Sequence, residues 1–168
     1  MDKLTSIFDE QFARLHEHNA ALVRVVPPEK LYWQPRESAG AFPVYSCGEH
    51  VLRGAAAVEQ AFGGITANLW DDPFEWTLPE ALATPGRVTE YLNEVEETRR
   101  RGFALFRGDD DLTREIAVPS GRMQTLCALL AATLARAAHH QGVLVSLAAL
   151  RGRLDRALAS QVFPRHGV

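Results

Sequence analysis

The residues best suited to chemistry are two adjacent histidines, His139 and His140, inside the alanine-rich segment LARAAHHQGVL. An imidazole can bind a metal ion, transfer a proton or simply pack with one hydrogen bond. At about 100° per residue, His140 shares a helical face with Thr133, Ala137 and Leu144, whereas His139 is rotated away. We therefore expect His140 to point into the protein. Taken alone, a core histidine with one hydrogen bond is its simplest interpretation.

The remaining histidines and the two cysteines give fewer signals. His16 and His18 are two residues apart on a predicted helix, so they point in different directions; the surface is the preferred position, with the alternative that one of them faces the core. His166 lies in the C-terminal tail. Cys47 falls in the first turn of a predicted helix, whose positive end can lower the pKa of a thiol. An inert, packed cysteine is the alternative. The sequence contains no phosphate-binding glycine loop, nucleophile elbow or paired-cysteine zinc motif.

Helical elements must position these groups, and the first two are well marked. Apolar residues at spacings of three and four predict one helix near the N-terminus, which Pro27 should end. A second helix should begin with a capping box at Ser46 and Glu49, since both side chains can bond free amides of the first turn. It should run to about Phe62, where a glycine pair beginning at Gly63 would end it. The stripe of the first helix consists of Leu4, Phe8, Phe12, Leu15, Leu22 and Val26.

A third helix follows a segment without clear periodicity. Residues 65–83 contain two tryptophans and two prolines and are predicted to form a structured loop. Thr84 and Pro85 mark a helix start, with proline at the first helical position. This helix should reach about Phe106, and residues 97–102, with the sequence ETRRRG, should be its solvated face.

The last long helix completes an all-α fold. Residues 112–123 alternate weakly and contain a proline and a glycine, which indicates a connecting loop with a briefly extended part. The final helix should run from about Thr125 to Leu150, and the tail at 153–163 could form one more short helix. We therefore predict a single domain over 1–168, an antiparallel four-helix bundle with long loops.

Composition narrows the classes of function. The chain has 168 residues, of which 46% are hydrophobic and 23% charged, with a formal net charge of -3. These values are typical of a globular protein, and no basic face indicates a nucleic-acid partner. The N-terminus is polar and acidic, unlike a signal peptide, and the most apolar segment carries too many polar residues to span a membrane. A cytoplasmic protein is expected, and two cysteines exclude a disulfide framework.

The order of motifs resembles the DinB/YfiT-like superfamily of four-helix bundles. PPEKLYWQPRE is similar to the segment that follows the family's first helix. YSCGEHVLRGAAAVEQ is similar to the Trp-Ser-x-Gly-Glu-His start of its second helix. The closing segment, with AAHHQG and the final LRG, resembles the family's His-His-Arg-Gly-Gln motif and Leu-Arg-x-x-Gly ending. The likeness covers nearly the whole chain in the same order, and it implies a homodimer formed through helix faces.

The resemblance also implies a metal site, and this sequence departs from it. Members commonly hold zinc or nickel with one histidine from helix two and two histidines, four residues apart, from helix four. Position by position, these ligands fall on Arg53, Arg136 and His140. A shifted alignment would place His50, one turn before Arg53, at the helix-two position. A guanidinium has no lone pair and stays charged, so two arginines would repel a divalent cation.

These substitutions favour a binding or structural protein without the metal. The candidate pocket consists of His50, Arg53, Arg136 and His140, with no cofactor expected. If both arginines converge there and are partly buried, an anion should compensate them. That anion could be an internal carboxylate or a small carboxylate or phosphate ligand. Alternatively, both arginines extend to solvent and the pocket has closed.

Two enzymatic alternatives remain open. One is a thiol-dependent transferase- or hydrolase-like enzyme that uses Cys47. The other is a metalloprotein that holds zinc or nickel with His50 and His140 and an acidic third ligand, for which Glu17, Glu49 and Glu59 are the candidates. The sequence names no substrate for any of the three hypotheses.

Overall fold

Four long helices dominate the described part of the chain. The computed structural model describes residues 3–34, 44–72 and 79–150. The predicted tail helix, His166 and the second of the two loop tryptophans lie outside these residues. The helices are α1 (Lys3–Val25), α2 (Cys47–Ala67), α4 (Pro85–Phe103) and α5 (Leu126–Leu150). Short elements between them are η1 (Pro28–Lys30), η2 (Pro79–Leu82), η3 (Asp109–Thr113), β1 (Glu115–Ala117) and β2 (Met123–Thr125). The predicted helical class is therefore confirmed.

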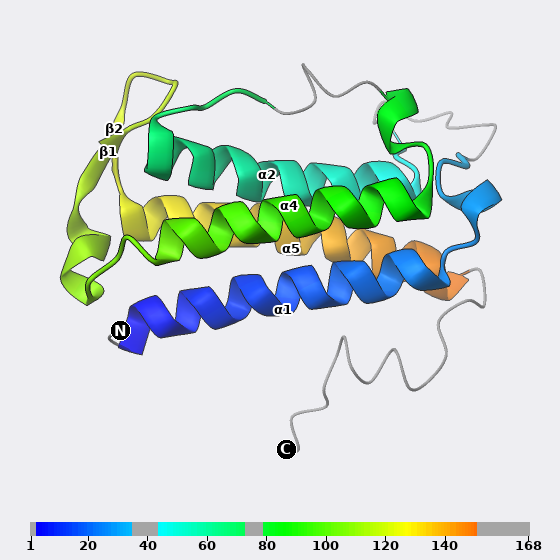
Figure 1. Cartoon of the computed structure of the whole chain (residues 1–168), viewed down its shortest axis with the longest axis horizontal. Coiled ribbons are helices and arrows are strands. Elements are labelled where there is room, and N and C mark those ends of the chain that lie inside the picture. The colour runs from blue at the N-terminus through cyan, green and yellow to red at the C-terminus, as the bar shows by residue number, and fades with distance from the viewer. Residues whose placement is uncertain (1–2, 35–43, 73–78, 151–168) are drawn as a thin grey trace.

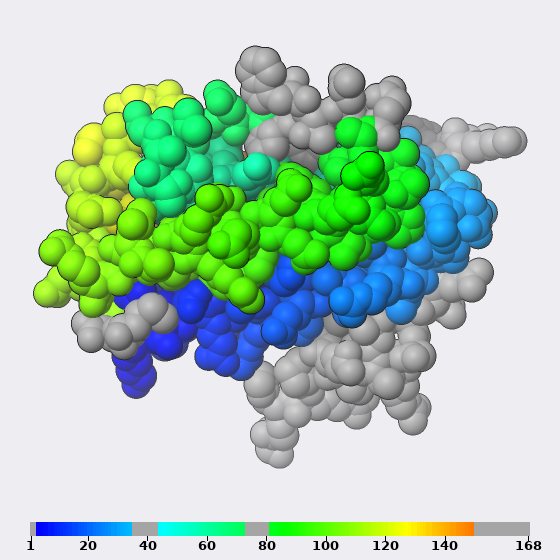
Figure 2. All heavy atoms as spheres, viewed as in Figure 1, coloured from blue at the N-terminus to red at the C-terminus, as the bar shows by residue number. Residues whose placement is uncertain are grey.

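The helices form a four-membered bundle with a specific order of neighbours. α2 packs against α5 and α4, α1 packs against α4 and α5, and α1 lies diagonally across from α2. α1 and α5 run in one direction and α2 and α4 in the other (Figure 1). The neighbouring pairs α1–α5 and α2–α4 are therefore parallel, and the expectation of a fully antiparallel bundle is wrong for both pairs, because α4 begins at the end of the bundle where α2 begins. α4 and α1 lie side by side on one face of the molecule (Figure 2).

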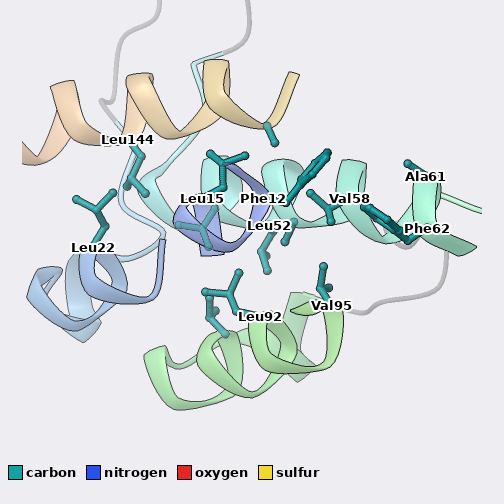
Figure 3. Close-up of a cluster of buried hydrophobic side chains, with 14 of the residues drawn as sticks. Phe12, Leu15, Leu22, Leu52, Val58, Ala61, Phe62, Leu92, Val95 and Leu144 are labelled. Carbon is teal, nitrogen blue, oxygen red and sulfur yellow. The ribbon is translucent and has the colours of Figure 1, made fainter. Parts of the chain in front are cut away.

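A continuous hydrophobic core joins the helices, and three phenylalanines lie near its centre. The ring of Phe12 meets that of Phe62 edge-on with 5.4 Å between centroids, and Phe103 lies 5.2 Å from Phe62. Gly102 permits this approach, since a Cβ there would lie 2.4 Å from the Phe62 ring. Burying each such side chain contributes about 1.5–3 kcal/mol. Labelled core residues from α1, α2 and α4 converge in Figure 3.

The start of α2 matches the prediction, but its end does not. Ser46 and Glu49 form the predicted capping box. The helix then continues through Gly63 and Gly64 to Ala67 and ends at Asn68, which adopts the left-handed conformation with φ 54°. A Cβ on Gly64 would lie 2.5 Å from the Trp70 ring. This glycine therefore serves close packing inside the helix, and Asn68 supplies the turn that the glycine pair was expected to make.

α4 begins at the predicted Thr84 cap and ends one turn earlier than expected. Its predicted solvated face at 97–102 is wrong for Arg99, which is only 4% exposed. Arg99 forms a two-pronged ion pair with Glu96, with nitrogen–oxygen distances of 2.7 and 2.8 Å, and its third nitrogen pairs with Asp9 of α1. Two carboxylates thus compensate a cation that the helical repeat turns toward α1.

A short hairpin replaces most of the loop predicted at 112–123. β1 and β2 pair antiparallel, with Glu115 opposite Thr125, and Gly121 takes a positive φ of 76° in the turn. Weak alternation had indicated only a brief extension. None of the helices in the described residues is long and apolar enough to cross a membrane.

Candidate functional site

The first turn of α2 fixes the backbone that carries His50. Glu49 Oε2 accepts hydrogen bonds of 2.7 Å from the Ser46 amide and from Gln34 Nε2. Burial acts to raise the pKa of Glu49, but these hydrogen bonds outweigh it and hold that pKa below its ordinary value. The Gly48 amide also donates to the Leu31 carbonyl at 2.7 Å. His50 follows directly and is only 7% exposed.

α5 brings His140 to the same place, as its helical face predicts. Leu126, Ala137 and Leu144 on that face are buried, and His140 is half-buried, whereas His139 is exposed. Gly54 of α2 lets the two helices approach closely. A Cβ at position 54 would lie 3.5 Å from the Ala137 carbonyl oxygen and 3.6 Å from the His140 Cβ.

The resulting imidazole pair is the centre of the site. Nδ1 of His50 and Nδ1 of His140 are 3.1 Å apart, and the ring centroids are 5.4 Å apart. At this distance one nitrogen donates and the other accepts, so the hydrogen bond requires that at least one of the two rings is neutral. Burial lowers the pKa of His140 to about 4, and His50, His139, Arg136 and Arg53 act in the same direction. Burial likewise lowers the pKa of His50, although Glu49 opposes it.

The two arginines at the expected ligand positions lie near this pair in different environments. Arg53 is half-buried, and its guanidinium lies 3.9 Å from the centroid of the Tyr45 ring, a stacking geometry that favours a cation. Tyr45 in turn meets His50 edge-on at 5.6 Å. Arg136 is exposed, one turn before His140 on α5. The alternative in which both arginines extend to solvent therefore holds for Arg136 only, because Arg53 packs against an aromatic ring.

Of the three ligand positions that the resemblance implies, only His140 carries a histidine, and His50 lies beside it. Two nitrogens on one tetrahedral zinc ion, with bonds of about 2.0–2.1 Å, lie roughly 3.3–3.4 Å apart, close to the 3.1 Å between His50 and His140. Among the described residues, however, no group of three or more histidine, cysteine, aspartate or glutamate side chains could hold a metal ion. The described donor set thus falls one ligand short.

The acidic side chains that were considered as a third metal ligand either make other hydrogen bonds or are exposed. Glu49 belongs to the α2 cap, and Glu59 accepts a 2.6 Å hydrogen bond from the Tyr91 hydroxyl. Glu17 is exposed on α1. None of them joins the imidazole pair in a ligand group.

The other cysteines and histidines that the sequence offered as candidates are not part of the imidazole pair. Cys47 is 1% exposed, which disfavours the thiol-dependent alternative and fits a packed cysteine. Cys127 is exposed at the start of α5. His16 and His18 were expected at the surface, but both are half-buried, and His16 lines an internal cavity. The expectation of a surface position is therefore wrong for His16.

Tyr45 is the residue that sequence reasoning missed. It connects Arg53 to His50 through two ring contacts. The signals were its place directly before the Ser46 cap, where a side chain can fold back over the first turn, and its match to the aromatic residue that opens the Trp-Ser-x-Gly-Glu-His motif. These signals do not show which residue of the turn the ring will cover.

No family model matches the chain, and no curated protein and no solved structure matches it either. The resemblance to the DinB/YfiT-like superfamily therefore depends on the sequence motifs alone.

Proposed function

We propose that the protein binds a small anionic molecule, a carboxylate or a phosphate, at the imidazole pair, without a metal ion. The observation that carries the proposal is the hydrogen-bonded His50–His140 pair, with Arg53 and Arg136 near enough to lower the pKa of His140. The pair offers one free N–H donor, Nε2 of the ring whose Nδ1 accepts, and Arg136 offers an exposed cation. Charge-assisted hydrogen bonds from a guanidinium are directional and well matched to carboxylate and phosphate oxygens.

The electrostatic setting supports an anion rather than a cation. Arg53, Arg136 and His139 all act to lower the pKa of His140, so positive charge gathers around this ring. Glu49, the carboxylate next in sequence to His50, is engaged by the α2 cap. An incoming anion would therefore meet favourable charge and one free imidazole N–H, whereas a divalent cation would meet two guanidinium groups.

Thermal unfolding with small carboxylates and phosphates tests the proposal. An anion at about ten times its dissociation constant should stabilise the folded protein by about 1.4 kcal/mol, which corresponds to a rise of roughly 3–6 °C in Tm. Arg136→Met should lose this rise because it removes the exposed guanidinium. Arg101→Met is the matched control, since Arg101 is an exposed helical arginine on α4.

The pattern across the three proteins decides the outcome. A rise that is kept in Arg101→Met and lost in Arg136→Met supports the site. Equal rises in all three would show general screening by salt, and no rise in the wild type would remove the anion from the proposal. Lower stability of Arg136→Met without any anion effect would indicate an internal ion pair instead.

A metal-dependent function is the second candidate, and the 3.1 Å spacing of the two Nδ1 atoms favours it. In that case His50 and His140 would be two of the ligands of zinc or nickel. Elemental analysis of the purified protein tests it. About one ion per chain, lost in His140→Ala, would support this candidate and contradict the metal-free proposal.

We also propose that the protein is a member of the DinB/YfiT-like superfamily. We propose further that it is located in the cytoplasm and forms a homodimer. The order of motifs and the four-helix arrangement support the family. Sedimentation equilibrium tests the dimer, because the chain has a mass of 18.6 kDa and a dimer would have twice that value.

A further inference from the structure

A small, partly open cavity lies between the helices, next to the segments that carry the imidazole pair, because Gly54 and Ala137 belong to its wall. All four long helices contribute to its wall, and the space open to a water-sized sphere is about 20 Å³. Phe12, Leu92 and Val95 form part of its apolar wall and converge in the close-up of the core (Figure 3). Polar side chains, among them His16 and Asn19 of α1, line another part.

The charged groups in this wall satisfy one another. Arg99 engages Glu96 with two nitrogens and Asp9 with the third, and Glu96 also accepts a 2.9 Å hydrogen bond from Arg100. Four of the five N–H donors of the guanidinium are thus engaged by protein oxygens, and two carboxylates compensate its charge. A neutral occupant therefore suits the cavity better than an anion.

Among the described residues, two other polar groups in the wall, the Asn19 side-chain N–H groups and the His16 ring, have no hydrogen-bond partner. Asn19 is 5% exposed, and its Oδ1 accepts a 2.9 Å hydrogen bond from Gln141 Nε2. Within the described residues, no acceptor is found for the Asn19 side-chain N–H groups, and none of these residues hydrogen-bonds the His16 ring. A buried amide donor without an acceptor is unfavourable, and such groups in proteins usually bond to ordered water.

We propose that this cavity binds one water molecule, which accepts a hydrogen bond from Asn19 Nδ2 and hydrogen-bonds the imidazole of His16. The size of the cavity fits, because a single water needs about 10–15 Å³ measured in this way, and an organic molecule needs far more. The polarity fits as well, because two unpartnered polar groups line the same space. Burial keeps the pKa of His16 low, so its ring is neutral and can donate from one nitrogen and accept at the other.

The bound water also helps to hold α5 in position. It holds one end of the Asn19 amide, and Gln141, the neighbour of His140, holds the other end. Gln141 Nε2 additionally donates to the Leu15 carbonyl at 3.0 Å. Water, Asn19 and Gln141 thus form a chain of hydrogen bonds from the cavity to the segment of α5 that carries the imidazole pair. This inference is independent of the proposed anion site.

A crystal structure at about 1.5 Å and magnetic relaxation dispersion of the water nuclei in solution test the proposal. The map of the wild-type protein should show one water within hydrogen-bond distance of Asn19 Nδ2 and of a His16 ring nitrogen. In solution, Asn19→Leu should have one long-lived water fewer than the wild type. Asn93→Leu is the matched control, because Asn93 is an exposed asparagine of α4, and it should keep the same number.

Each alternative result contradicts the proposal. An empty cavity in the wild-type map would overturn it, as would a water that contacts neither Asn19 nor His16. If Asn19→Leu is unstable, the wild-type map still decides. An unchanged number of long-lived waters in a folded Asn19→Leu protein would also overturn it.

Discussion

At the scale of single residues, His140 remains neutral because its surroundings penalise its protonation. Its ring is partly removed from water, it lies 3.1 Å from a second imidazole, and two arginines are nearby. In the unfolded chain the same residue would take up a proton near pH 6.5. The difference between the two states makes the histidine pair a source of pH-dependent stability.

We predict that the free energy of unfolding falls as pH is lowered from about 6.5 toward 4. The folded pKa of His140 is about 4 and lies below the unfolded value, so the unfolded chain binds more protons in this window and gains from acidity. The loss should be about 1–2 kcal/mol, less than the full shift would give, because the ring is partly exposed. Urea denaturation at several pH values measures it.

The histidine variants isolate this contribution. In His140→Leu, stability should depend less on pH between 6.5 and 4. His139→Leu is the control, since His139 is the exposed neighbour on the same helix and its removal should leave most of the slope. An identical slope in wild type and His140→Leu would contradict the prediction.

Helical periodicity predicted which way His140 points but not what it meets. The angle per residue places His140 on the face of Ala137 and Leu144, and both are buried. Its partner depends on the register of α5 against α2, which the contact of Gly54 with Ala137 sets. Register between distant segments leaves no periodic signal. The sequence could therefore name His50 as a candidate without showing that its ring would lie beside that of His140.

At the scale of the helices, glycines set how closely α2 and α4 approach. Gly102 of α4 lies against the ring of Phe62 in α2, and both residues are buried. Gly142 of α5 has the opposite setting, because a Cβ there would meet nothing within 4 Å.

Gly102→Ala should therefore destabilise the protein, whereas Gly142→Ala should not. The new methyl group at position 102 would lie 2.4 Å from the Phe62 ring, and such overpacking costs about 1–3 kcal/mol. At position 142, alanine should stabilise the helix by about 0.5–1 kcal/mol through its higher helix propensity. Thermal unfolding measures both effects, and a neutral or stabilising Gly102→Ala would show that α2 and α4 can separate without cost.

The buried ion pair of α4 should be worth far more to stability than an exposed pair with the same spacing. Glu96→Gln leaves the buried Arg99 with a single carboxylate, Asp9, and should cost about 3–5 kcal/mol. Glu90→Gln is matched to it, because Glu90 and Arg87 are also three residues apart but exposed, and it should cost under about 0.5 kcal/mol. Denaturation curves at neutral pH measure the two losses, which should differ several-fold. Similar losses would mean that water reaches Arg99 in the folded state.

Sequence signals were reliable at helix starts and less so at helix ends. The Ser46 and Thr84 caps were predictable because a cap depends on residues within one turn. The end of α2 was not, because Gly64 contacts Trp70 and the helix stops only at Asn68. Burial of Arg99 was missed for a related reason, since its compensating Asp9 lies 90 residues away in the sequence.

At the scale of the whole molecule, the order of neighbouring helices brings distant parts of the chain together. The helical class could be predicted from apolar spacing, because each helix carries its own stripe. The parallel direction of α2 and α4 could not, since no local pattern shows that α4 begins at the end of the bundle where α2 begins (Figure 1). As a result, η3 and the hairpin lie at the end of the bundle where α1 begins.

Asp109 connects η3 to the start of α1, which is distant from it in the sequence. Its carboxylate accepts hydrogen bonds of 3.0 Å from the Leu4 amide and 2.8 Å from the Thr5 amide, and a third of 2.9 Å from the Thr5 hydroxyl. The first amides of a helix have no partner within it, and the positive end of the helix favours a negative charge. A residue more than 100 positions away thus bonds two amides in the first turn of α1.

Asp109→Asn should therefore lower Tm by a few degrees at pH 7 and loosen the start of α1. The hydrogen bonds from Leu4 and Thr5 hold the pKa of Asp109 below its ordinary value of 3.8. A carboxylate with a depressed folded pKa adds stability that is fully present above the unfolded pKa and is lost as pH falls through the folded pKa. The gap in Tm between wild type and Asp109→Asn should accordingly be constant from neutral pH to about 5 and shrink below 3.8. Hydrogen exchange of the Leu4 and Thr5 amides should accelerate in the variant at pH 7, while Asp110→Asn, a change at the exposed neighbour, leaves both amides protected. Equal exchange in the two variants would mean that packing of α1 against α4 and α5, rather than this carboxylate, holds the beginning of the chain in place.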